Sequence, residues 1–259
     1  MNLVSVIMNC HNGEKFLNES VKSVINQTYQ NWELIFFDNL SNDNSKKILQ
    51  SFRDKRIKYF NSKKFLDLYA ARNLAIEKSS GKYISFLDTY DYWSSNKLEQ
   101  QVKFLESNNE YKIVYSNYFV IDEKKKIKSL KHKIKLPYGS ISQELLDFYC
   151  IGILSVLLEK SFFKSYSFNN EYNIIGDFDF FIRLSNKFKI GCIQEPLAYY
   201  RIHDKNFSLT KLDIYINELN KWILSNEGKL SLNRLNLRKQ KILLLKLKIK
   251  NFLRSLIKW

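Results

Sequence analysis

Three polar segments of this sequence carry side chains that could bind a metal ion and phosphates, and each follows an apolar run. The segments are residues 9–12, 38–43 and 88–91. Carboxylate and amide oxygens are the ligands that Mg²⁺ and Mn²⁺ prefer. A divalent ion that bridges a diphosphate neutralises the charge that develops when the diphosphate leaves. The pattern therefore favours a site for a phosphate-bearing ligand and a metal, with Asp88 as the strongest candidate ligand.

The elements that must bring these segments together alternate between strands and helices. The predicted strands are residues 3–8, 32–38, 56–60 and 83–87, and the predicted helices are residues 14–26, 45–52 and 70–79. Such alternation predicts an α/β unit with a parallel sheet. Because ligands bind beyond the carboxyl ends of the strands in such sheets, the three polar segments are expected to converge.

The second half of the chain is less regular. Its predicted helices are residues 96–107, 141–148 and 177–187, its predicted strands are residues 113–121, 153–158 and 197–202, and a lysine-rich turn spans residues 124–126. The chain of 259 residues is long enough for one large domain or two small ones, and a hydrophobic fraction of 45% allows a sizeable core. Three cysteines far apart, with no CxxC pair, predict reduced and mostly buried thiols. The sequence predicts neither a signal peptide nor a transmembrane span.

The C-terminal tail is strongly basic. The formal net charge of the chain is +16, and after Glu227 there is no Asp or Glu. Ten Lys or Arg follow there, interleaved with apolar residues: Lys229, Arg234, Arg238, Lys239, Lys241, Lys246, Lys248, Lys250, Arg254 and Lys258. A basic amphipathic helix fits an anionic membrane surface, although a helix packed on its own domain or on a second copy is the alternative. The leucine-rich character of the tail and the lack of an RNA-binding motif argue against a nucleic-acid partner.

The ordered motifs of the chain resemble family 2 glycosyltransferases. Residues 4–45 look like the opening of that family, and two later pieces, YAARNLAIEKSSGKYISFLDTYDYW and GDFDFFIRLSNKF, resemble its later motifs. The resemblance implies the GT-A fold, an α/β fold with a mainly parallel central sheet flanked by helices. It also implies a glycosyltransferase domain over residues 1–205, with a nucleotide-sugar half at 1–100 and an acceptor half at 101–205. Residues 206–259 are then a helical basic extension.

The resemblance also assigns candidate site residues. It places Asn9, Cys10 and Asn12 beside the donor nucleotide, Asp38 on the base or ribose, Arg72 near the diphosphate, and Asp88 at the first Asp of the DxD motif. The implied metal, Mn²⁺ or Mg²⁺, would be bound by Asp88, Asp91 and His203. Tyr90 departs from the family, which has a second Asp there that usually binds the metal. Asp91 or Asp88 could replace it, the metal could bind weakly, or catalysis could be lost.

Asp177 matches the Asp of the family's Glu-Asp motif, the usual catalytic base of inverting members, and Gly176 replaces its Glu. Asp179 is the fallback base. Each of these assignments has a structural alternative: Asp38 can cap a helix, Asp177 is favourable at a helix N-terminus, and His203 could be a surface or packing residue.

The implied function is transfer of a sugar from a nucleoside-diphosphate sugar, with UDP the commonest nucleotide, to a glycan or lipid-linked acceptor, with inversion. The context suggests surface polysaccharide synthesis at the cytoplasmic face of a bacterial cell membrane. The alternative is a non-catalytic nucleotide-sugar-binding relative or partner subunit.

Overall fold

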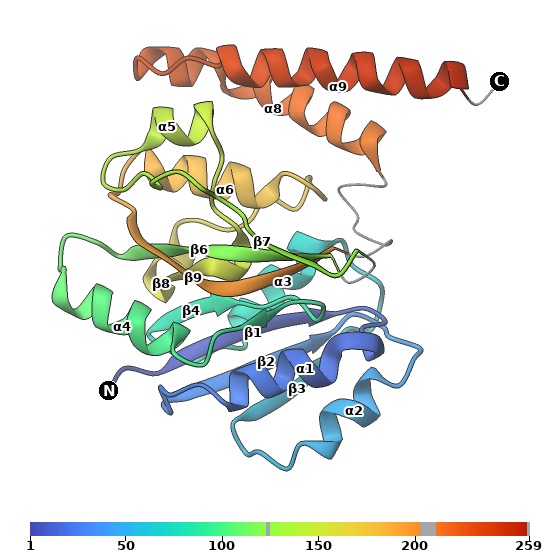
Figure 1. The fold of residues 1–259 in the computed structure, drawn as a ribbon, viewed down its shortest axis with the longest axis vertical. Helices are drawn as coiled ribbons and strands as arrows, with labels where there is room; N and C mark the ends of the chain where they lie inside the picture. Colours follow the sequence, from blue (N-terminus) through green and yellow to red (C-terminus); the bar gives the residue numbers. More distant parts are fainter. Residues whose placement is uncertain (123–124, 203–210, 258–259) are drawn as a thin grey trace.

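The structure is a computed structural model that describes residues 1–122, 125–202 and 211–257. Within these residues the strands form one nine-stranded sheet in the order β3-β2-β1-β4-β8-β6-β9-β5 (Figure 1). The ninth strand, β7, pairs with β6 and lies outside this order. The strands are β1 Val4–Cys10, β2 Trp32–Asp38, β3 Ile57–Asn61, β4 Tyr83–Phe86, β5 Tyr92–Trp93, β6 Ile113–Asp122, β7 Ile127–Leu130, β8 Val156–Glu159 and β9 Gly191–Ile202. The predicted central sheet is confirmed.

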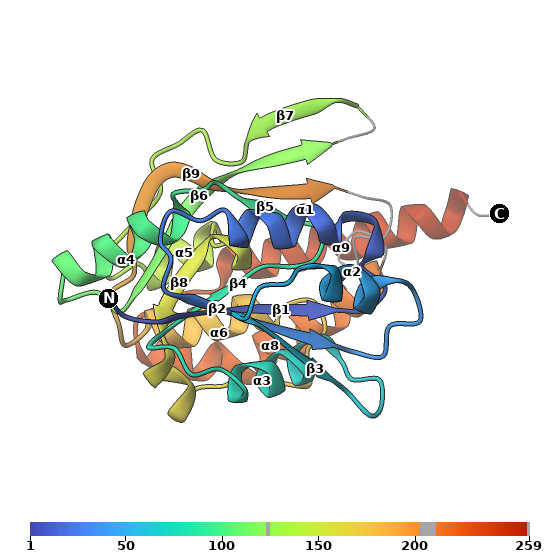
Figure 2. The same ribbon diagram turned by 90° about the horizontal axis from the view of Figure 1, so that it is seen from below.

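Helices cover both faces of the sheet. They are α1 Glu14–Ile25, α2 Ser45–Ser51, α3 Leu68–Glu77, α4 Lys97–Ser107, α5 Ser142–Asp147, α6 Gly176–Ser185, α8 Leu212–Leu232 and α9 Arg238–Ile257, with short 3₁₀ segments at η1 Ile153–Ser155 and η2 Lys160–Lys164. Apolar side chains of α1, α2 and α4 form one buried cluster, and those of α3, α5, α6 and α8 form another. Helices α1 and α3 accordingly lie on opposite sides of β1 (Figure 2). Successive strand residues enter opposite clusters, as side chains on a pleated strand must.

Parallel pairing is confined to two parts of the sheet. Strands β3, β2, β1 and β4 are parallel to one another, as the strand–helix alternation predicted. Strand β8 then joins β4 and β6 antiparallel, while β9 runs parallel to β6. The expectation of a mainly parallel sheet therefore holds for the first hundred residues, and the second half is mixed.

The sequence-based boundaries fail where tertiary contacts define the element. The strand predicted over residues 153–158 begins with the 3₁₀ turn η1 and becomes extended only at Val156. Strand β5 has two residues, too few for a periodic signal, and exists because it pairs with β9. The exposed, lysine-bearing β7 was not predicted because its only strand partner among the described residues is β6.

The two C-terminal helices differ in how they are covered. Helix α8 buries Leu219, Trp222 and Ile223 in the same cluster as the apolar residues of α6. Helix α9 lies across α8 and α5, at the top of Figure 1. Neither helix, nor any other in the described part of the chain, is both long and apolar enough to cross a membrane. The proposed boundary at residue 205/206 stays a prediction, but α8 shares its core with the rest of the domain.

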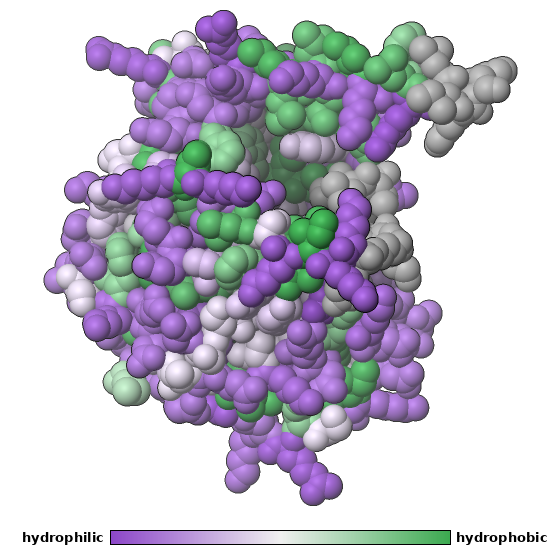
Figure 3. Space-filling view, in the orientation of Figure 1, coloured by the Kyte–Doolittle hydropathy of each residue, from purple (hydrophilic) through white to green (hydrophobic). Residues whose placement is uncertain are grey.

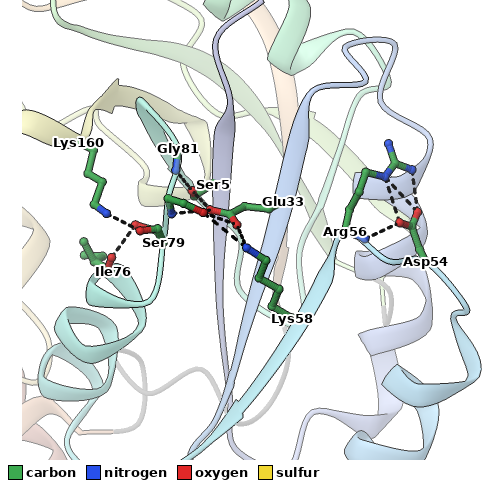
Figure 4. Close-up of polar contacts among 10 residues, drawn as sticks. Ser5, Glu33, Asp54, Arg56, Lys58, Ile76, Ser79, Gly81 and Lys160 are labelled. Carbon is green, nitrogen blue, oxygen red and sulfur yellow. Dashed lines mark hydrogen bonds and ion pairs between the residues drawn. The ribbon is translucent and has the colours of Figure 1, made fainter.

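A buried carboxylate joins β1, β2 and β3 near the amino ends of these strands (Figure 4). Glu33 is almost fully buried and accepts hydrogen bonds from the Ser5 hydroxyl, from the Lys58 ammonium, and from the backbone and side chain of Ser80. Burial by itself raises the pKa of the Glu33 carboxyl, but the hydrogen bonds outweigh it and lower the pKa to about 2. The folded protein therefore stabilises the ionised form of Glu33.

Glu33→Gln is expected to lower the free energy of unfolding at pH 7 by about 3 kcal/mol, because a pKa lowered from about 4.5 to about 2 stabilises the folded state by that amount. The stabilisation is present above the unfolded pKa of Glu and is lost as pH falls toward 2. Urea unfolding at pH 7, 5 and 3 should therefore show the difference between wild type and variant shrinking with acidification. A difference that stays constant across this range would contradict the assignment.

Asp54→Asn is the matched control. Asp54 pairs with Arg56 at 2.7 Å near the same end of the sheet, but both side chains are partly exposed (Figure 4). Exposed ion pairs contribute about 0–1 kcal/mol, so this variant should lose much less stability than Glu33→Gln.

Candidate active site

The three polar segments converge at the carboxyl ends of the parallel strands, as predicted. Cys10 at the end of β1 is in register with Asp38 at the end of β2. The backbone N–H of Leu87, directly after β4, donates to the carbonyl of Ile7 at 3.0 Å. Asp88 follows at once, so the residues after β1, β2 and β4 share one edge of the sheet.

The first two loops are tied together by hydrogen bonds. The Asn12 side chain accepts from the Asn42 backbone at 2.9 Å, and the Gly13 backbone donates to the Ser45 hydroxyl at 3.0 Å. Asn12 has φ +56°, a left-handed conformation that Asn tolerates better than most residues. A Cβ atom on Gly13 would lie 2.8 Å from the Thr89 hydroxyl, so the loop after β4 also packs directly on this turn.

Asp38 is buried, and both of its oxygens have partners. One accepts from the Ser41 backbone and the other from the Tyr59 hydroxyl, each at 2.8 Å. The neighbouring Cys10 thiol is also buried, and this burial raises its pKa, which argues against a nucleophilic thiolate. The structure therefore supports positioning roles for both side chains, while their contact with a nucleotide stays a prediction.

Asn9 differs from its neighbours. Both polar atoms of its side chain are buried and have no hydrogen-bond partner among the described residues. An unmade hydrogen bond of a buried group costs about 1–3 kcal/mol. Asn9 thus has unused hydrogen-bonding capacity at the end of β1, which is compatible with its predicted place beside the donor.

Arg72 and Asp88 form the charged centre of the site. Arg72 Nη2 lies 3.1 Å from Asp88 Oδ1, and the Arg72 side chain is only 3% exposed whereas that of Asp88 is 38% exposed. Rings of Tyr69, Phe86 and Phe168 surround the guanidinium at 5.4–5.6 Å from their centroids. The aromatic cage fixes the cation, and the cation holds a carboxylate that remains open to solvent.

Asp91 has a different environment from Asp88. It is buried, and its Oδ1 accepts the Arg201 backbone N–H at 2.9 Å, which ties the loop to the end of β9. Burial, and then the nearby Asp88 carboxylate, raise the pKa of Asp91 well above its usual range. These contacts show that Asp91 holds the loop after β4 against β9. A metal-ligand role for Asp91 stays a prediction.

No three His, Cys, Asp or Glu side chains within the described ranges gather closely enough to enclose a metal ion. His203, the third predicted ligand, lies outside the described residues. Mg²⁺ commonly binds through one or two carboxylates plus substrate phosphates and water. The open Asp88 carboxylate fits that mode of binding, in which the donor itself completes the coordination.

Asp177 is the second residue of α6 and lies beside Tyr69 of α3. Asp177 Oδ1 accepts the Phe178 backbone N–H at 2.8 Å and lies 3.3 Å from the Tyr69 hydroxyl. Burial raises the pKa of the Asp177 carboxyl, although the Phe178 amide and the Arg72 cation oppose the shift. A carboxylate with a raised pKa is suited to accept a proton near neutral pH.

Asp179, the fallback base, is committed elsewhere. Its Oδ2 pairs with Arg183 Nε at 2.9 Å, and its Oδ1 accepts the Trp222 indole N–H at 3.0 Å. Asp179 is buried by these contacts, whereas Asp177 is only partly buried. Asp179 is therefore less available than Asp177, in keeping with its place as the fallback, and the role of Asp177 as the base stays a prediction.

Helix α3 links the two carboxylates. Tyr69 and Arg72 are three residues apart and so lie on one face of the helix, where Tyr69 contacts Asp177 and Arg72 contacts Asp88. Tyr69 and Trp222 are not recognisable from the sequence as site residues, because an aromatic residue within a helical pattern looks like an ordinary core residue. Figure 3 shows a hollow with a hydrophobic floor beneath α8 and α9, bordered by α6, which carries Asp177.

Comparison with known families identifies the family to which the fold and the motifs belong. The family model described as "Glycosyl transferase family 2" matches residues 5–166 of the chain. The chain belongs to glycosyl transferase family 2. An Escherichia coli member, UDP-Glc:alpha-D-GlcNAc-diphosphoundecaprenol beta-1,3-glucosyltransferase WfgD, is 37% identical over 166 residues, which cover 64% of this chain and 64% of that protein. A second E. coli glucosyltransferase of the same description, WfaP, is 29% identical over 85% of each chain.

Other family members extend the match. An uncharacterised glycosyltransferase of Methanocaldococcus jannaschii is 32% identical over 81% of this chain and 74% of its own length. Among solved structures, residues 1–349 of S. aureus TarS superpose with a TM-score of 0.68 at 15% identity, covering 86% of this chain and 66% of that one. The same protein in complex with UDP-GlcNAc gives a TM-score of 0.65 at 14% identity. At this identity the likeness to TarS establishes the fold alone.

The two departures from the family motifs have local explanations in this structure. A Cβ atom on Gly176 would lie 2.4–2.6 Å from carbons of the Tyr69 ring, so this ring occupies the space that a Glu side chain would need. Tyr90 is partly buried and packs edge-to-face on Phe16 with 6.1 Å between ring centroids. Burial, then the nearby Cys10 and Asp88, raise the pKa of the Tyr90 hydroxyl, which therefore stays neutral at pH 7.

Proposed function

We propose that this chain is an inverting glycosyltransferase that moves a sugar from a UDP-sugar to a glycan or lipid-linked acceptor in surface polysaccharide synthesis. The observation that carries the proposal is the arrangement around α3. One carboxylate, Asp88, is held beside a buried cation, Arg72. A second, Asp177, has a raised pKa and contacts Tyr69, which lies one helical turn before Arg72 on α3. These are the two groups that sugar transfer from a diphosphate requires.

In the proposed reaction, Asp177 accepts the proton of the acceptor hydroxyl while that oxygen attacks the anomeric carbon. The bond between this carbon and the diphosphate oxygen breaks, and UDP leaves with the electron pair. A single displacement of this kind inverts the configuration at the anomeric carbon. Arg72 contributes positive charge beside the departing diphosphate, in an aromatic surrounding that strengthens electrostatic attraction.

A divalent ion, Mn²⁺ or Mg²⁺, would be bound by Asp88 and would neutralise charge on the leaving diphosphate. UDP is favoured as the nucleotide because WfgD and WfaP are described as using UDP-Glc. Their described acceptor, a GlcNAc-diphosphoundecaprenol, motivates a lipid-linked acceptor here. The non-catalytic alternative rested on Tyr90 and Gly176, and it is not favoured because the Asp88–Arg72 pair and Asp177 are in place.

The first test is thermal stabilisation of the full chain by UDP, with GDP, dTDP and CMP as comparisons, in Mn²⁺, Mg²⁺ or EDTA. A ligand at one hundred times its Kd adds about 2.7 kcal/mol of stability, which is measurable as a shift in Tm. We expect UDP to raise Tm and the other three nucleotides not to do so. In a second assay, we expect the chain to release UDP from a UDP-sugar. If no nucleotide shifts Tm at several millimolar, the proposal is wrong.

Helix α9 is proposed to bind the anionic inner surface of the cell membrane, which would bring the site to a lipid-linked acceptor. Leu244 faces the core, whereas Leu245, Ile249, Phe252 and Leu253 are exposed. Figure 3 shows hydrophobic surface along the helix at the top of the view. These apolar residues alternate with the lysines of the tail. Each basic residue near an anionic surface contributes about 1 kcal/mol.

The double variant Ile249→Ser, Phe252→Ser is expected to bind vesicles containing 30% phosphatidylglycerol about tenfold or more weakly than wild type, because each burial of such a side chain contributes about 1.5–3 kcal/mol. Co-sedimentation is the measurement. Neutral phosphatidylcholine vesicles are the control, and wild type should bind them far less. Equal binding of wild type and variant to the anionic vesicles would rule out this face of α9 as the contact.

A further inference from the structure

A single carboxylate of α8 accepts hydrogen bonds from three consecutive backbone amides before the candidate base. Glu218 Oε1 lies 2.6 Å from the Asn173 nitrogen, and Oε2 lies 2.9 Å from that of Ile174 and 3.1 Å from that of Ile175. Glu218 is 8% exposed. Gly176 and Asp177, which begin α6, follow directly, so the carboxylate fixes the backbone one residue before the helix that carries the base.

This arrangement is electrostatically strong. Hydrogen bonds from amides to an ionised carboxylate are shorter and about twice as strong as those between neutral groups. The N-terminus of a helix also carries a partial positive charge, so an anion at this place is favoured. Residues 173–175 pair with no strand in the described structure. Their backbone N–H groups donate to the Glu218 carboxylate in place of strand carbonyls.

The same helix holds the other side of Asp177. Trp222 lies four residues after Glu218 and therefore on the same face of α8. Its indole donates to Asp179 at 3.0 Å, and its ring packs edge-to-face on Phe178 with 4.7 Å between ring centroids. Contacts from α8 thus flank Asp177 both before and after it in the chain.

We propose that Glu218 is a positioning residue for sugar transfer: by binding the amides of residues 173–175, it fixes the direction in which Asp177 meets the acceptor. The inference rests on the proposed role of Asp177. It makes α8 part of the catalytic machinery, although α8 lies in the segment that the sequence suggested was an extension. Glu218 touches neither donor nor acceptor in this proposal.

Glu218→Gln tests the proposal because the amide has the same shape but turns an N–H₂ group toward backbone N–H donors. Glu171→Gln is the matched control. Glu171 also joins this loop to α8, through an ion pair with Lys221 at 2.9 Å, but both side chains are exposed and the pair does not involve the three amides. Release of UDP from UDP-glucose, UDP-galactose and UDP-GlcNAc is measured for wild type and both variants, below the Tm of each.

The expected result for Glu218→Gln is a kcat about 10–100-fold lower with the donor KM unchanged, because misplacing a reacting group by about 1 Å can cost 10²-fold. UDP should shift Tm of the variant as it does for wild type. Hydrogen exchange at the amides of residues 173–175 should accelerate. Glu171→Gln should match wild type in all three measurements. Should Glu218→Gln not fold, Glu218→Asp, which keeps the charge on a shorter side chain, is expected to give an intermediate kcat.

Each outcome is decisive. Unchanged kcat in Glu218→Gln, with faster amide exchange, overturns the positioning role but leaves the proposed function intact. A raised donor KM or a lost UDP shift would mean that Glu218 acts through general stability, which also overturns it. If no nucleotide shifts the Tm of the wild type, the proposed function fails and this inference fails with it.

Discussion

Replacing Asp177 with Asn is expected to lower sugar transfer by about 10²–10⁴-fold, the usual contribution of a general base. The Asn side chain can still accept the Phe178 N–H and occupies the same volume, so the fold should be unaffected. It has no lone pair basic enough to take the acceptor proton. UDP should therefore stabilise the variant as much as wild type, while steady-state transfer and UDP release are lost.

The pH dependence of kcat/KM should identify Asp177 as the general base. Because burial raises the pKa of Asp177, wild-type kcat/KM is expected to fall as pH decreases through a value above the ordinary range for Asp. The residual activity of Asp177→Asn should lack this acidic limb.

Asp179→Asn is the matched control, since its amide oxygen still accepts from Trp222 and only the pair with Arg183 is weakened. Transfer should fall far less than in Asp177→Asn. Equal losses in the two variants, or an Asp177→Asn enzyme within tenfold of wild type, would count against Asp177 as the base.

Asp88→Asn is expected to remove the dependence of UDP binding on metal and to lower transfer by about 10²–10³-fold, the magnitude of losing one preorganised charge contact in a transition state. Asp88 is the accessible carboxylate at the junction of the strand ends, and its partner Arg72 is buried. Without Asp88, the Arg72 guanidinium loses its anionic partner but keeps the positive charge that we propose lies beside the diphosphate. UDP stabilisation in Mn²⁺ should then drop to the level seen in EDTA.

Asp91→Asn separates this role from that of its neighbour. Asp91 is buried with a pKa raised well above its usual range, so an amide is close to its neutral form and can still accept from the Arg201 backbone. If Asp91 only fastens the loop, this variant keeps metal-dependent UDP stabilisation. If both variants lose it, Asp91 is a ligand as the sequence suggested. An Asp88→Asn protein that still binds UDP in a metal-dependent manner would exclude Asp88 as the principal ligand.

Much of the nucleotide half could be predicted from the chain alone. Strands β1, β2 and β4 are continuous apolar runs, and each ends where its polar segment begins, because both faces of a parallel sheet are buried while its carboxyl edge is open. That local signal was sufficient to place Cys10, Asp38 and Asp88 at one edge. It was weaker beyond residue 100, where β5 and β7 depend on partners distant in sequence.

The sequence by itself determined the family, the α/β alternation and the carboxylates that could act, because these follow from local periodicity and from motifs of short range. Only the tertiary structure showed that the Asp179 carboxylate is occupied by other contacts, among them a hydrogen bond from Trp222 more than forty residues later. It also explained Gly176 by the Tyr69 ring and brought Glu218 to the loop before the base. Such contacts depend on how helices pack across the sheet, and no residue pattern within one segment encodes the identity of a partner in another.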